Sequence, residues 1–374
     1  MNNQGQPISA GKFISRGDFF ADMGDYDSAI ADYTKAIRFS PCIKNYLSRD
    51  TPVPTCLVDK WRRYAVVYKQ RGFAYGLKGD YDQAIEDFTQ AINIDPNYAV
   101  AYHYRGIVYC IKDDYKQAIA DYTQVVSIDP AYAGAYYDRG DAYWENKKDY
   151  ASAMADITQA ININPKLAGA YNYRGSLYIL NEEYDRAIED LTQAISIDPY
   201  FTAAYYHRGQ ANEEKGDYDS AIDDYTHVIR LDPDQYTNYY QRGKAFLKKN
   251  DFDSAIRDFT HAINIYPNEE LAYWNRGEAF YSKGDYDSAI ADFTQAISID
   301  PHYYLPYYDR GMAFYNRGDY DSAIADYTQA IRLYCGFDEA REGIKIARKM
   351  RRRKIWKWLA RPFKYHGLVP MIFY

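Results

Sequence analysis

Length, composition and charge exclude several classes of protein. The chain has 374 residues, a net charge of −7, 47% apolar residues and 26% charged residues, a balance that excludes a disordered chain. Its 4 cysteines are too few for a disulfide-stabilised scaffold. No apolar run is long enough to predict a membrane helix, and the N-terminus lacks the pattern of a secretory signal. We therefore expect a cytoplasmic protein.

The chain is rich in tyrosine, with 44 residues of this type, and an Arg-Gly pair recurs along it. Most copies are 34 residues apart, but the first step is 55 and the step after Gly140 is 35, which indicates one insertion of 21 residues and one of a single residue. The glycines are Gly17, Gly72, Gly106, Gly140, Gly175, Gly209, Gly243, Gly277 and Gly311. In chain order we predict an N-terminal extension (1–9), a first unit (10–43), an insertion loop (44–64), eight units across 65–337 (65–98, 99–132, 133–167, 168–201, 202–235, 236–269, 270–303, 304–337) and a C-terminal segment (338–374).

Each unit is predicted to be a pair of antiparallel helices. Apolar residues recur at three- and four-residue spacing in two stretches, which a short polar turn separates. Five turns contain Gly-Asp, and we expect the glycine to end the first helix and the aspartate to cap the second. These glycines are Gly24, Gly79, Gly216, Gly284 and Gly318. Every unit but the last ends in proline, which we expect at the first position of the following helix.

The pattern resembles that of the tetratricopeptide repeat family over about four fifths of the chain. The fourth unit reads Tyr-x2-Arg-Gly-x2-Tyr at 136–143, Ala-x3-Ile at 153–157, and then Pro165. Tyrosine and arginine replace the family's tryptophan and leucine in the first stretch, and Asn212 stands where an aromatic residue is expected. The resemblance implies an all-α fold, a right-handed α-solenoid (superhelix) of antiparallel helix pairs in which each hairpin packs on its neighbours.

Residues at fixed positions are predicted to have packing roles. One alanine of every second helix is expected to face the glycine of the Arg-Gly pair. An arginine precedes that glycine in all nine units, and an aspartate holds one position of every second helix. Since a charge that replaces leucine is partly buried, we predict that the two pair, with two solvated charges as the alternative. The pairs would be Arg16–Asp32, Arg71–Asp87, Arg105–Asp121, Arg139–Asp156, Arg174–Asp190, Arg208–Asp224, Arg242–Asp258, Arg276–Asp292 and Arg310–Asp326.

The family resemblance also implies a peptide-binding groove along the first helices. In similar proteins, positions 2, 5, 6, 9, 12 and 13 of each unit face this groove. The residues predicted to form it are His103, Tyr104, Tyr137, Asp138, Asp141, Asn172, Tyr173, Tyr206, His207, Tyr240, Gln241, Trp274, Asn275, Tyr308 and Asp309. They vary between units while the structural positions hardly do, as expected of a recognition surface, although drift on an idle face would have the same effect. For any one tyrosine, packing against a neighbouring helix is the alternative.

Charge narrows the predicted partner. The groove positions carry three basic residues (Lys69, Lys244, Lys248) and nine acidic ones (Asp18, Asp22, Asp138, Asp141, Glu145, Glu213, Glu214, Glu278, Asp309). The expected partner is therefore a peptide or protein segment that is neutral or basic. Tyrosine rows suit such a segment, because they offer rigid apolar area and a face for Arg or Lys.

The two irregular segments have different predicted roles. The insertion contains Thr-Pro-Val-Pro and is expected to be a surface loop that leads into an early helix start near Asp59. Residues 336–374 carry a charge of +8, which leaves −15 for the rest of the chain. The C-terminal segment is expected to cap the stack with a basic helix. Two other roles stay open: occupancy of the protein's own groove or that of a second copy, and a tether to anionic membrane or nucleic acid. The tether would use Arg351, Arg352, Arg353, Lys354, Trp356, Lys357 and Trp358.

No catalytic or metal-binding motif is present. The chain has no phosphate-binding loop, no HExxH and no GxSxG, and its carboxylates recur with the repeat. Cys42, Cys56, Cys110 and Cys335 form no metal-binding spacing, and reduced thiols are expected, with a Cys42–Cys56 bridge as a minor option. We therefore predict no cofactor and no enzymatic activity, and a protein-interaction scaffold as the function.

Overall fold

In the computed structural model, every described element is an α-helix. The structure describes the backbone of residues 10–39 and 55–359, and the side chains of residues 10–39 and 62–353. The chain divides into two compact units, Met1–Asp198 and Pro199–Tyr374. Among the described residues, no helix is long and apolar enough to cross a membrane.

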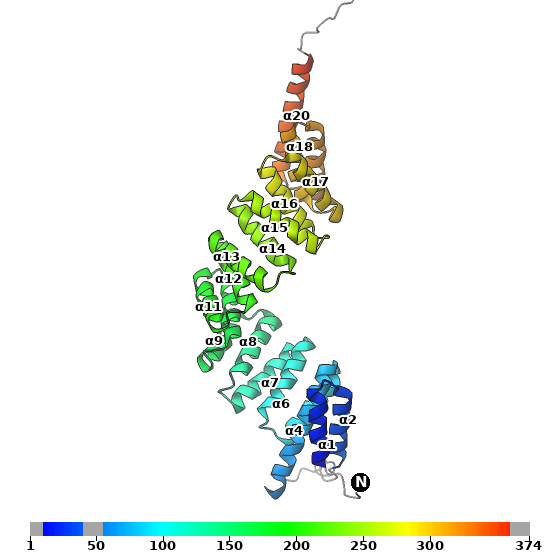
Figure 1. Cartoon of the computed structure of the whole chain (residues 1–374), viewed down its shortest axis with the longest axis vertical. Helices are drawn as coiled ribbons and strands as arrows, with labels where there is room; N and C mark the ends of the chain where they lie inside the picture. The colour runs from blue at the N-terminus through cyan, green and yellow to red at the C-terminus, as the bar shows by residue number, and fades with distance from the viewer. Residues whose placement is uncertain (1–9, 40–54, 360–374) are drawn as a thin grey trace, which may run out of the picture. The chain divides into compact units, whose positions relative to one another are not determined.

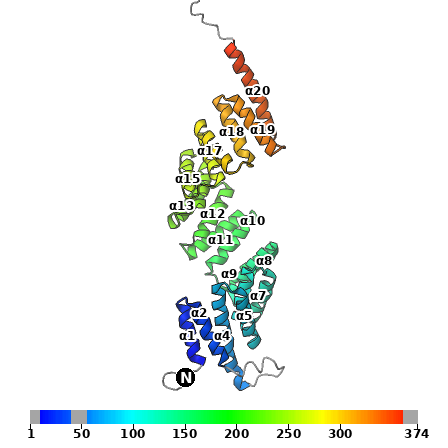
Figure 2. The same ribbon diagram turned by 90° about the vertical axis from the view of Figure 1, so that its right-hand side faces the viewer.

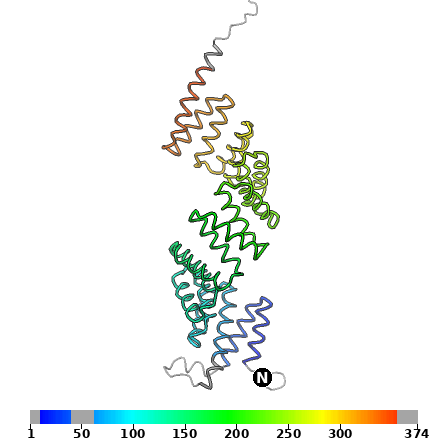
Figure 3. Tube along the Cα trace, turned by 90° about the vertical axis from the view of Figure 1, so that its left-hand side faces the viewer, coloured from blue at the N-terminus to red at the C-terminus, as the bar shows by residue number. Residues whose placement is uncertain are grey.

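The first compact unit, Met1–Asp198, contains five helical hairpins, which follow one another in chain order (Figure 1). Each hairpin corresponds to one of the repeats. The two helices of each hairpin lie side by side, and the first helix of the next hairpin packs against the second (Figure 3). The hairpins are α1 (Ala10–Asp22) and α2 (Tyr26–Arg38), α4 (Thr55–Lys78) and α5 (Tyr81–Ile94), α6 (Ala99–Ile111) and α7 (Tyr115–Ile128), α8 (Ala133–Lys147) and α9 (Tyr150–Ile163), and α10 (Ala168–Leu180) and α11 (Tyr184–Ile197).

The second unit contains four hairpins and a final single helix. The hairpins are α12 (Thr202–Lys215) and α13 (Tyr218–Leu231), α14 (Tyr236–Lys248) and α15 (Phe252–Ile265), α16 (Glu270–Ser282) and α17 (Tyr286–Ile299), and α18 (Tyr304–Arg317) and α19 (Tyr320–Leu333). The final helix, α20 (Asp338–Leu359), packs on α19, and its C-terminal part extends beyond the last hairpin (Figures 1 and 2). The predicted fold class, a tandem array of antiparallel helix pairs, is confirmed.

The loop that the insertion forms is shorter than predicted. Helix α4 begins at Thr55, four residues before the expected start, so residues 55–64 are helical. The physical reason is that no glycine or proline follows Pro54 until Gly72, and nothing stops the helix from extending back to that proline. Residues 40–54 lie outside the described part of the chain.

The turns inside the hairpins follow the prediction closely. All five Gly-Asp glycines have left-handed backbone torsions, with φ between 76° and 84°. The carboxylates of Asp25, Asp217, Asp285 and Asp319 each accept a hydrogen bond from the backbone N–H three residues later. Asp80 makes no such bond, so its predicted capping role is not confirmed.

The predicted role of the prolines is wrong. Pro96 lies in the turn between hairpins, and the next helix begins three residues later, at Ala99. The preceding residue shapes this turn, because Asp95 Oδ1 accepts a hydrogen bond from the N–H of Asn97 at 3.2 Å. Asp129, Asn164 and Asp300 bond two residues ahead in the same way. The acid therefore stabilises an Asx turn, and proline suits that turn because its φ is fixed.

The glycine of each Arg-Gly pair faces a large side chain of the second helix and not only the alanine. A Cβ on Gly209 would lie 2.8 Å from Cε1 of Tyr225, and one on Gly243 would lie 2.9 Å from Cε1 of Phe259. These rings lie four residues after the alanine of the second helix. The expectation of a glycine–alanine contact is therefore incomplete, because the glycine makes room for a buried ring or branched side chain in the second helix.

All nine predicted Arg–Asp pairs form. Each guanidinium donates to both carboxylate oxygens through Nε and Nη2, and the eight pairs after Arg16–Asp32 have N–O distances of 2.6–3.0 Å. The aspartates are buried, with 2–7% of their surface exposed. The alternative of two solvated charges is therefore excluded for these pairs.

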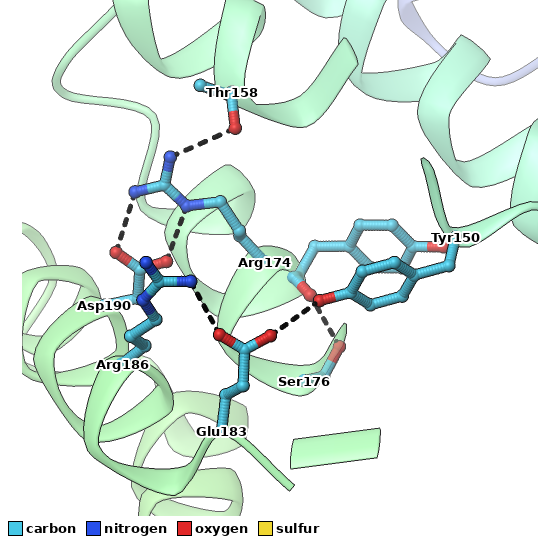
Figure 4. Close-up of polar contacts among 8 residues, drawn as sticks. Tyr150, Thr158, Arg174, Ser176, Glu183, Arg186 and Asp190 are labelled. Atoms are coloured by element: carbon cyan, nitrogen blue, oxygen red, sulfur yellow. Dashed lines mark hydrogen bonds and ion pairs between the residues drawn. The ribbon is translucent and has the colours of Figure 1, made fainter. Parts of the chain in front are cut away.

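The arginine also binds the preceding hairpin, which the sequence analysis did not predict. In Figure 4, Arg174 lies between Asp190 of its own hairpin and Thr158 of the hairpin before it, with Nη1 3.3 Å from the threonine Oγ1. The other such bonds are Arg71–Thr34, Arg105–Thr89, Arg139–Thr123, Arg242–Thr226, Arg276–Thr260 and Arg310–Thr294, at 2.9–3.2 Å. We call this three-residue contact the arginine bracket. A tyrosine three residues before the arginine covers it, as Tyr171 covers Arg174 at 5.8 Å.

Asn212 adapts to the missing aromatic residue in its unit. The side chain is 7% exposed, and its Nδ2 donates to Oδ2 of Asp224, the partner of Arg208, at 3.3 Å. The substitution thus exchanges ring packing for an additional hydrogen bond to the buried carboxylate.

Helix α20 packs as the first helix of a tenth unit. Ala340 and Ala347 are fully buried and occupy the positions that Ala272 and Ala279 hold in α16. Arg351 donates to Asp321 of the preceding hairpin at 2.5 Å. The equivalent exposed pairs between hairpins are Lys78–Asp27, Lys112–Asp82, Lys249–Asp219, Lys283–Asp253 and Arg317–Asp287. The predicted capping role of the C-terminal helix is consistent with this packing.

Removing the threonine of an arginine bracket should destabilise the junction between hairpins. We expect Thr260→Val to lower the free energy of unfolding by about 1–2 kcal/mol, because Arg276 then loses one hydrogen-bond acceptor. Thr328→Val is the matched control, because Thr328 bonds the carbonyl oxygen of Ile324 as Thr260 bonds that of Ile256, but Ile344 replaces the arginine after it. Equal losses in urea unfolding would show that the bracket does not stabilise the junction.

Two glycines of α4 should respond in opposite directions to alanine. A Cβ at Gly72 would lie 3.0 Å from Phe88 Cε1 and 3.2 Å from the backbone oxygen of Ala84, whereas one at Gly76 would meet nothing within 4 Å. We expect Gly72→Ala to destabilise the protein by about 1–3 kcal/mol through overpacking. Gly76→Ala should be neutral or stabilise by up to about 1 kcal/mol, because alanine favours helix. Thermal denaturation of both variants tests the difference.

Candidate functional site on the first helices

The predicted groove residues of the second unit contact one another between hairpins. Position 5 of one hairpin bonds position 6 of the next. Tyr206 Oη accepts from Gln241 Nε2 at 3.2 Å, and Tyr240 Oη accepts from Asn275 Nδ2 at 3.1 Å. The indole Nε1 of Trp274 donates to Asp309 Oδ2 at 2.6 Å. We call these contacts rungs.

The first unit forms rungs at the same positions. His103 Nε2 lies 2.6 Å from Asp138 Oδ2, and its Nδ1 lies 3.1 Å from the hydroxyl of Tyr132. Tyr137 and Tyr173 make an edge-to-face contact with ring centroids 5.8 Å apart. The rungs therefore differ in chemistry but match within each pair. This explains part of the variation between repeats. The signal in the sequence was a separation of one repeat plus one residue between partners, which is 35 residues for His103 and Asp138 and 36 for Tyr137 and Tyr173.

The position 5 rings are half-buried. Each also packs on the large residue of its own second helix, with ring centroids 5.9 Å apart for Tyr206 and Tyr225 and 5.6 Å for Tyr308 and Tyr327. Asn275 and Asp309 are 6% and 8% exposed. A partner can therefore reach the edges of the rings, but Asn275 and Asp309 offer little surface.

The other predicted groove residues are half-buried as well. Tyr104 packs edge-to-face on Phe73 at 5.1 Å. His207 lies beside Tyr206, and burial lowers the pKa of its imidazole. Burial raises the pKa of Asp141, and the charges of Glu145 and Asp138 add to this effect. Asn172 is also half-buried, on α10.

Buried Asp309 and half-buried Glu278 carry perturbed carboxyl groups in the second compact unit. Burial raises the pKa of Asp309 to about 7; the bond from Trp274 opposes this shift, and the carboxylate of Glu278 adds to it. Burial also raises the pKa of Glu278, and the charge of Lys248 opposes that shift. A cation that reaches this part of the first helices would meet carboxylates that lack full compensation.

Each unit has a pocket lined mainly by groove positions. In the first unit, a cavity of about 230 Å³ lies among α1, α2 and α4, lined by Asp18, Asp22 and Lys69 among others. In the second unit, a cavity of about 440 Å³ lies among α16, α18, α19 and α20. Its lining contains glutamates of α20, which the sequence analysis did not assign to the groove. No group of His, Cys, Asp and Glu suited to a metal ion occurs among the described side chains.

Three of the seven residues predicted as a tether have described side chains. Arg351 is held in the ion pair with Asp321. Arg352 and Arg353 are exposed on α20, whereas the side chains of Lys354, Trp356, Lys357 and Trp358 lie outside the described residues. Of the cysteines, Cys110 and Cys335 are free thiols, and the proposed Cys42–Cys56 bridge lies outside the described residues.

The fold and the bracketed junctions define a protein built from stacked helical hairpins, each about 34 residues long. Models of the tetratricopeptide repeat match residues 13–41, 65–98, 88–120, 133–167, 168–201, 202–235 and 304–334, and a TPR repeat model matches 108–147, 243–284 and 277–318. Together they cover well over half of the chain, which belongs to the tetratricopeptide repeat family. No curated protein matches the chain.

Several solved structures are similar. The C-terminal part of a TPR repeat-containing protein from Cytophaga hutchinsonii has 19% identity and a TM-score of 0.55, and the match covers 65% of this chain and 99% of that one. PilF of Pseudomonas aeruginosa has 19% identity and a TM-score of 0.50, with 58% and 96% covered. YrrB, described as a TPR protein with an unusual peptide-binding site, has 22% identity and a TM-score of 0.45, with 50% and 97% covered. The first two show the same fold, and family membership supports a protein-interaction scaffold.

Replacing Asp309 should change how stability depends on pH. The folded pKa of about 7 is above the ordinary value of 3.8, so the folded state binds more protons between these values, and stability falls as pH rises through that window. Asp309→Asn removes this loss, and its amide oxygen can still accept from Trp274. We expect the variant to be more stable than the wild type by about 1–3 kcal/mol at pH 8, with the difference shrinking toward pH 4.

The measurement is thermal or urea unfolding of both proteins across that pH range. Asp287→Asn, at an exposed carboxylate, controls for the loss of one charge. A stability difference for Asp309→Asn that is the same at pH 4 and pH 8 would contradict the prediction.

Proposed function

We propose that the protein is a non-catalytic adapter that binds a peptide or protein segment along its first helices, in each unit separately or in both. The observation that carries the proposal is the composition of this surface in the second unit. It combines half-buried aromatic edges, which provide rigid apolar contact area, with carboxylates whose charge is incompletely compensated.

The charge of the surface favours a neutral or basic segment. Lys244 is compensated by Glu213 at 3.3 Å, and Lys248 lies near Glu278, so the few cations of the second unit's first helices are already offset. Since half-buried Glu278 remains poorly solvated, a positively charged partner would gain from approaching it, and an acidic partner would be repelled.

A tether through α20 is the second candidate. Arg348, Lys349, Arg352 and Arg353 are exposed and form no ion pair with the described side chains. Such a cluster favours anionic lipid or nucleic acid, and binding of this kind weakens steeply with added salt.

Site-specific photo-crosslinking separates the candidates. A crosslinking amino acid replaces exposed Asn316 on the first-helix surface of α18, exposed Gln295 on the second helix α17, or exposed Arg352 on α20. For the adapter we expect a protein partner to crosslink at position 316 and not at 295, because only the first position borders the groove. Equal crosslinking at 316 and 295 would contradict the adapter.

The tether has its own outcome in the same experiment. It predicts crosslinks at position 352 alone, to lipid or nucleic acid, and their loss in high salt. Alanine at Tyr206, Tyr240 and Trp274 is a poorer test, because these rings form rungs and their loss would also destabilise the junctions.

A further inference from the structure

The last junction of the second unit lacks a rung. Position 5 of α18 is Tyr308, and position 6 of α20 is Gly343, which has no side chain to contact it. The Tyr308 hydroxyl forms no hydrogen bond with the described residues, whereas the hydroxyls of Tyr206 and Tyr240 each accept one from the next hairpin. The ring of Tyr308 packs on Tyr327 of its own second helix, as the ring of Tyr206 packs on Tyr225.

The glycine at this place has a packing reason that keeps the space open. A Cβ on Gly343 would lie 2.9 Å from Cε2 and 3.0 Å from Cζ of Tyr327, a ring that is 3% exposed. Helix α20 can therefore approach α19 only without a side chain at this position. At the junctions that form a rung, a side chain at position 6 lies next to the position 5 ring. Here the space between Tyr308 and Gly343 is part of the 440 Å³ pocket.

The pocket combines aromatic walls with an acidic rim. Tyr281, Tyr308, Tyr315 and Tyr327 line it, and Glu339 and Glu342 border it from α20. The two glutamates are three residues apart and so lie on the same side of the helix, toward α18. Asn316 Nδ2 fixes the Tyr281 hydroxyl at 2.7 Å, which orients the ring on the far wall.

No cationic residue is among the described residues that line this pocket, and its carboxylates are available. Glu339 forms no ion pair with the described side chains. Among the described side chains Glu342 pairs only with Lys345 at 2.9 Å, and the lysine side chain is 73% exposed, so it can turn away at little cost. The thioether of Met312 and the side chain of Ile346 add apolar surface between the tyrosines and the rim.

We propose that this pocket binds a cationic side chain, lysine or arginine, of the segment that the protein recognises. The aliphatic stem would lie along Met312 and Ile346, and the charged head would reach Glu339 and Glu342 across the tyrosine rings. The Tyr308 hydroxyl is an open acceptor for one of its N–H groups. Aromatic faces and carboxylates attract a cation together, and an acidic side chain would be repelled by both. The inference rests on the proposed adapter function and names the chemistry of one contact.

The test uses the full chain and a set of labelled peptides that differ at one position. The probes are Gly-Ser-Gly-X-Gly-Ser-Gly peptides, in which X is arginine, lysine, norleucine or glutamate, and binding is measured by fluorescence anisotropy at low salt. We expect the arginine and lysine peptides to bind about tenfold more tightly than the norleucine peptide, and the glutamate peptide to bind more weakly still. Equal binding of the arginine and glutamate peptides would overturn the proposal.

Variants assign the binding to the pocket. Glu339→Gln/Glu342→Gln should remove most of the preference for arginine over norleucine, and Tyr308→Phe should weaken arginine binding while it keeps the ring. The matched control is Asp321→Asn/Asp338→Asn, which removes the same charge from exposed side chains that do not line the pocket. If the control variant loses the preference for arginine to the same extent, the preference depends on the net charge of the protein and not on the pocket. That result would overturn the assignment.

Failure of this inference and failure of the adapter function give different results. If crosslinks form at position 316 but the glutamine variant keeps its preference for arginine, the adapter function stands and the pocket assignment is wrong. If no partner crosslinks at 316, yet the arginine preference depends on Glu339 and Glu342, the pocket binds cations without serving the proposed adapter.

Discussion

The arginine bracket is the interaction on which the rest of the structure depends. One guanidinium joins a buried aspartate of its own hairpin to a threonine of the hairpin before, beside the face of a tyrosine, in the hairpins that carry Arg71, Arg105, Arg139, Arg174, Arg242, Arg276 and Arg310. A guanidinium suits this role because its donors point in fixed directions and its charge survives burial when a carboxylate is paired with it. Within each of the two compact units, these directional hydrogen bonds link neighbouring hairpins.

Because the arginine bracket links the hairpins, the residues on the first-helix surface can differ between repeats, but not without limit. The rungs show the limit, because wherever a rung forms, the residue at position 5 is matched by its partner at position 6 of the next hairpin. Tyrosine faces glutamine, asparagine or another tyrosine, tryptophan faces aspartate, and histidine faces aspartate. Variation between units therefore has two sources, matched contact inside the protein and recognition of a partner. Only the part of the first-helix surface that does not form rungs can recognise a partner.

The end of the array follows from the same rules. Helix α20 keeps the buried alanines and the exposed Arg351–Asp321 pair, but it lacks the Arg-Gly pair and so has no bracket. Its position 6 is glycine, which leaves Tyr308 without a rung and opens a pocket bordered by carboxylates. The missing rung and the opening of the pocket thus arise from one departure from the repeat.

The sequence by itself determined the hairpins, their number in the described chain and the nine Arg–Asp pairs, because helical periodicity, Gly-Asp turns and a constant spacing are local or repeated signals. It did not determine where Pro96 lies in its turn, what Gly209 faces, or that Thr158 and Asp309 are partners of Arg174 and Trp274. Those contacts join residues of different helices, and their geometry depends on how closely the hairpins pack. For the same reason the half-burial of the groove residues and the pocket beside α20 were decided only by the tertiary structure.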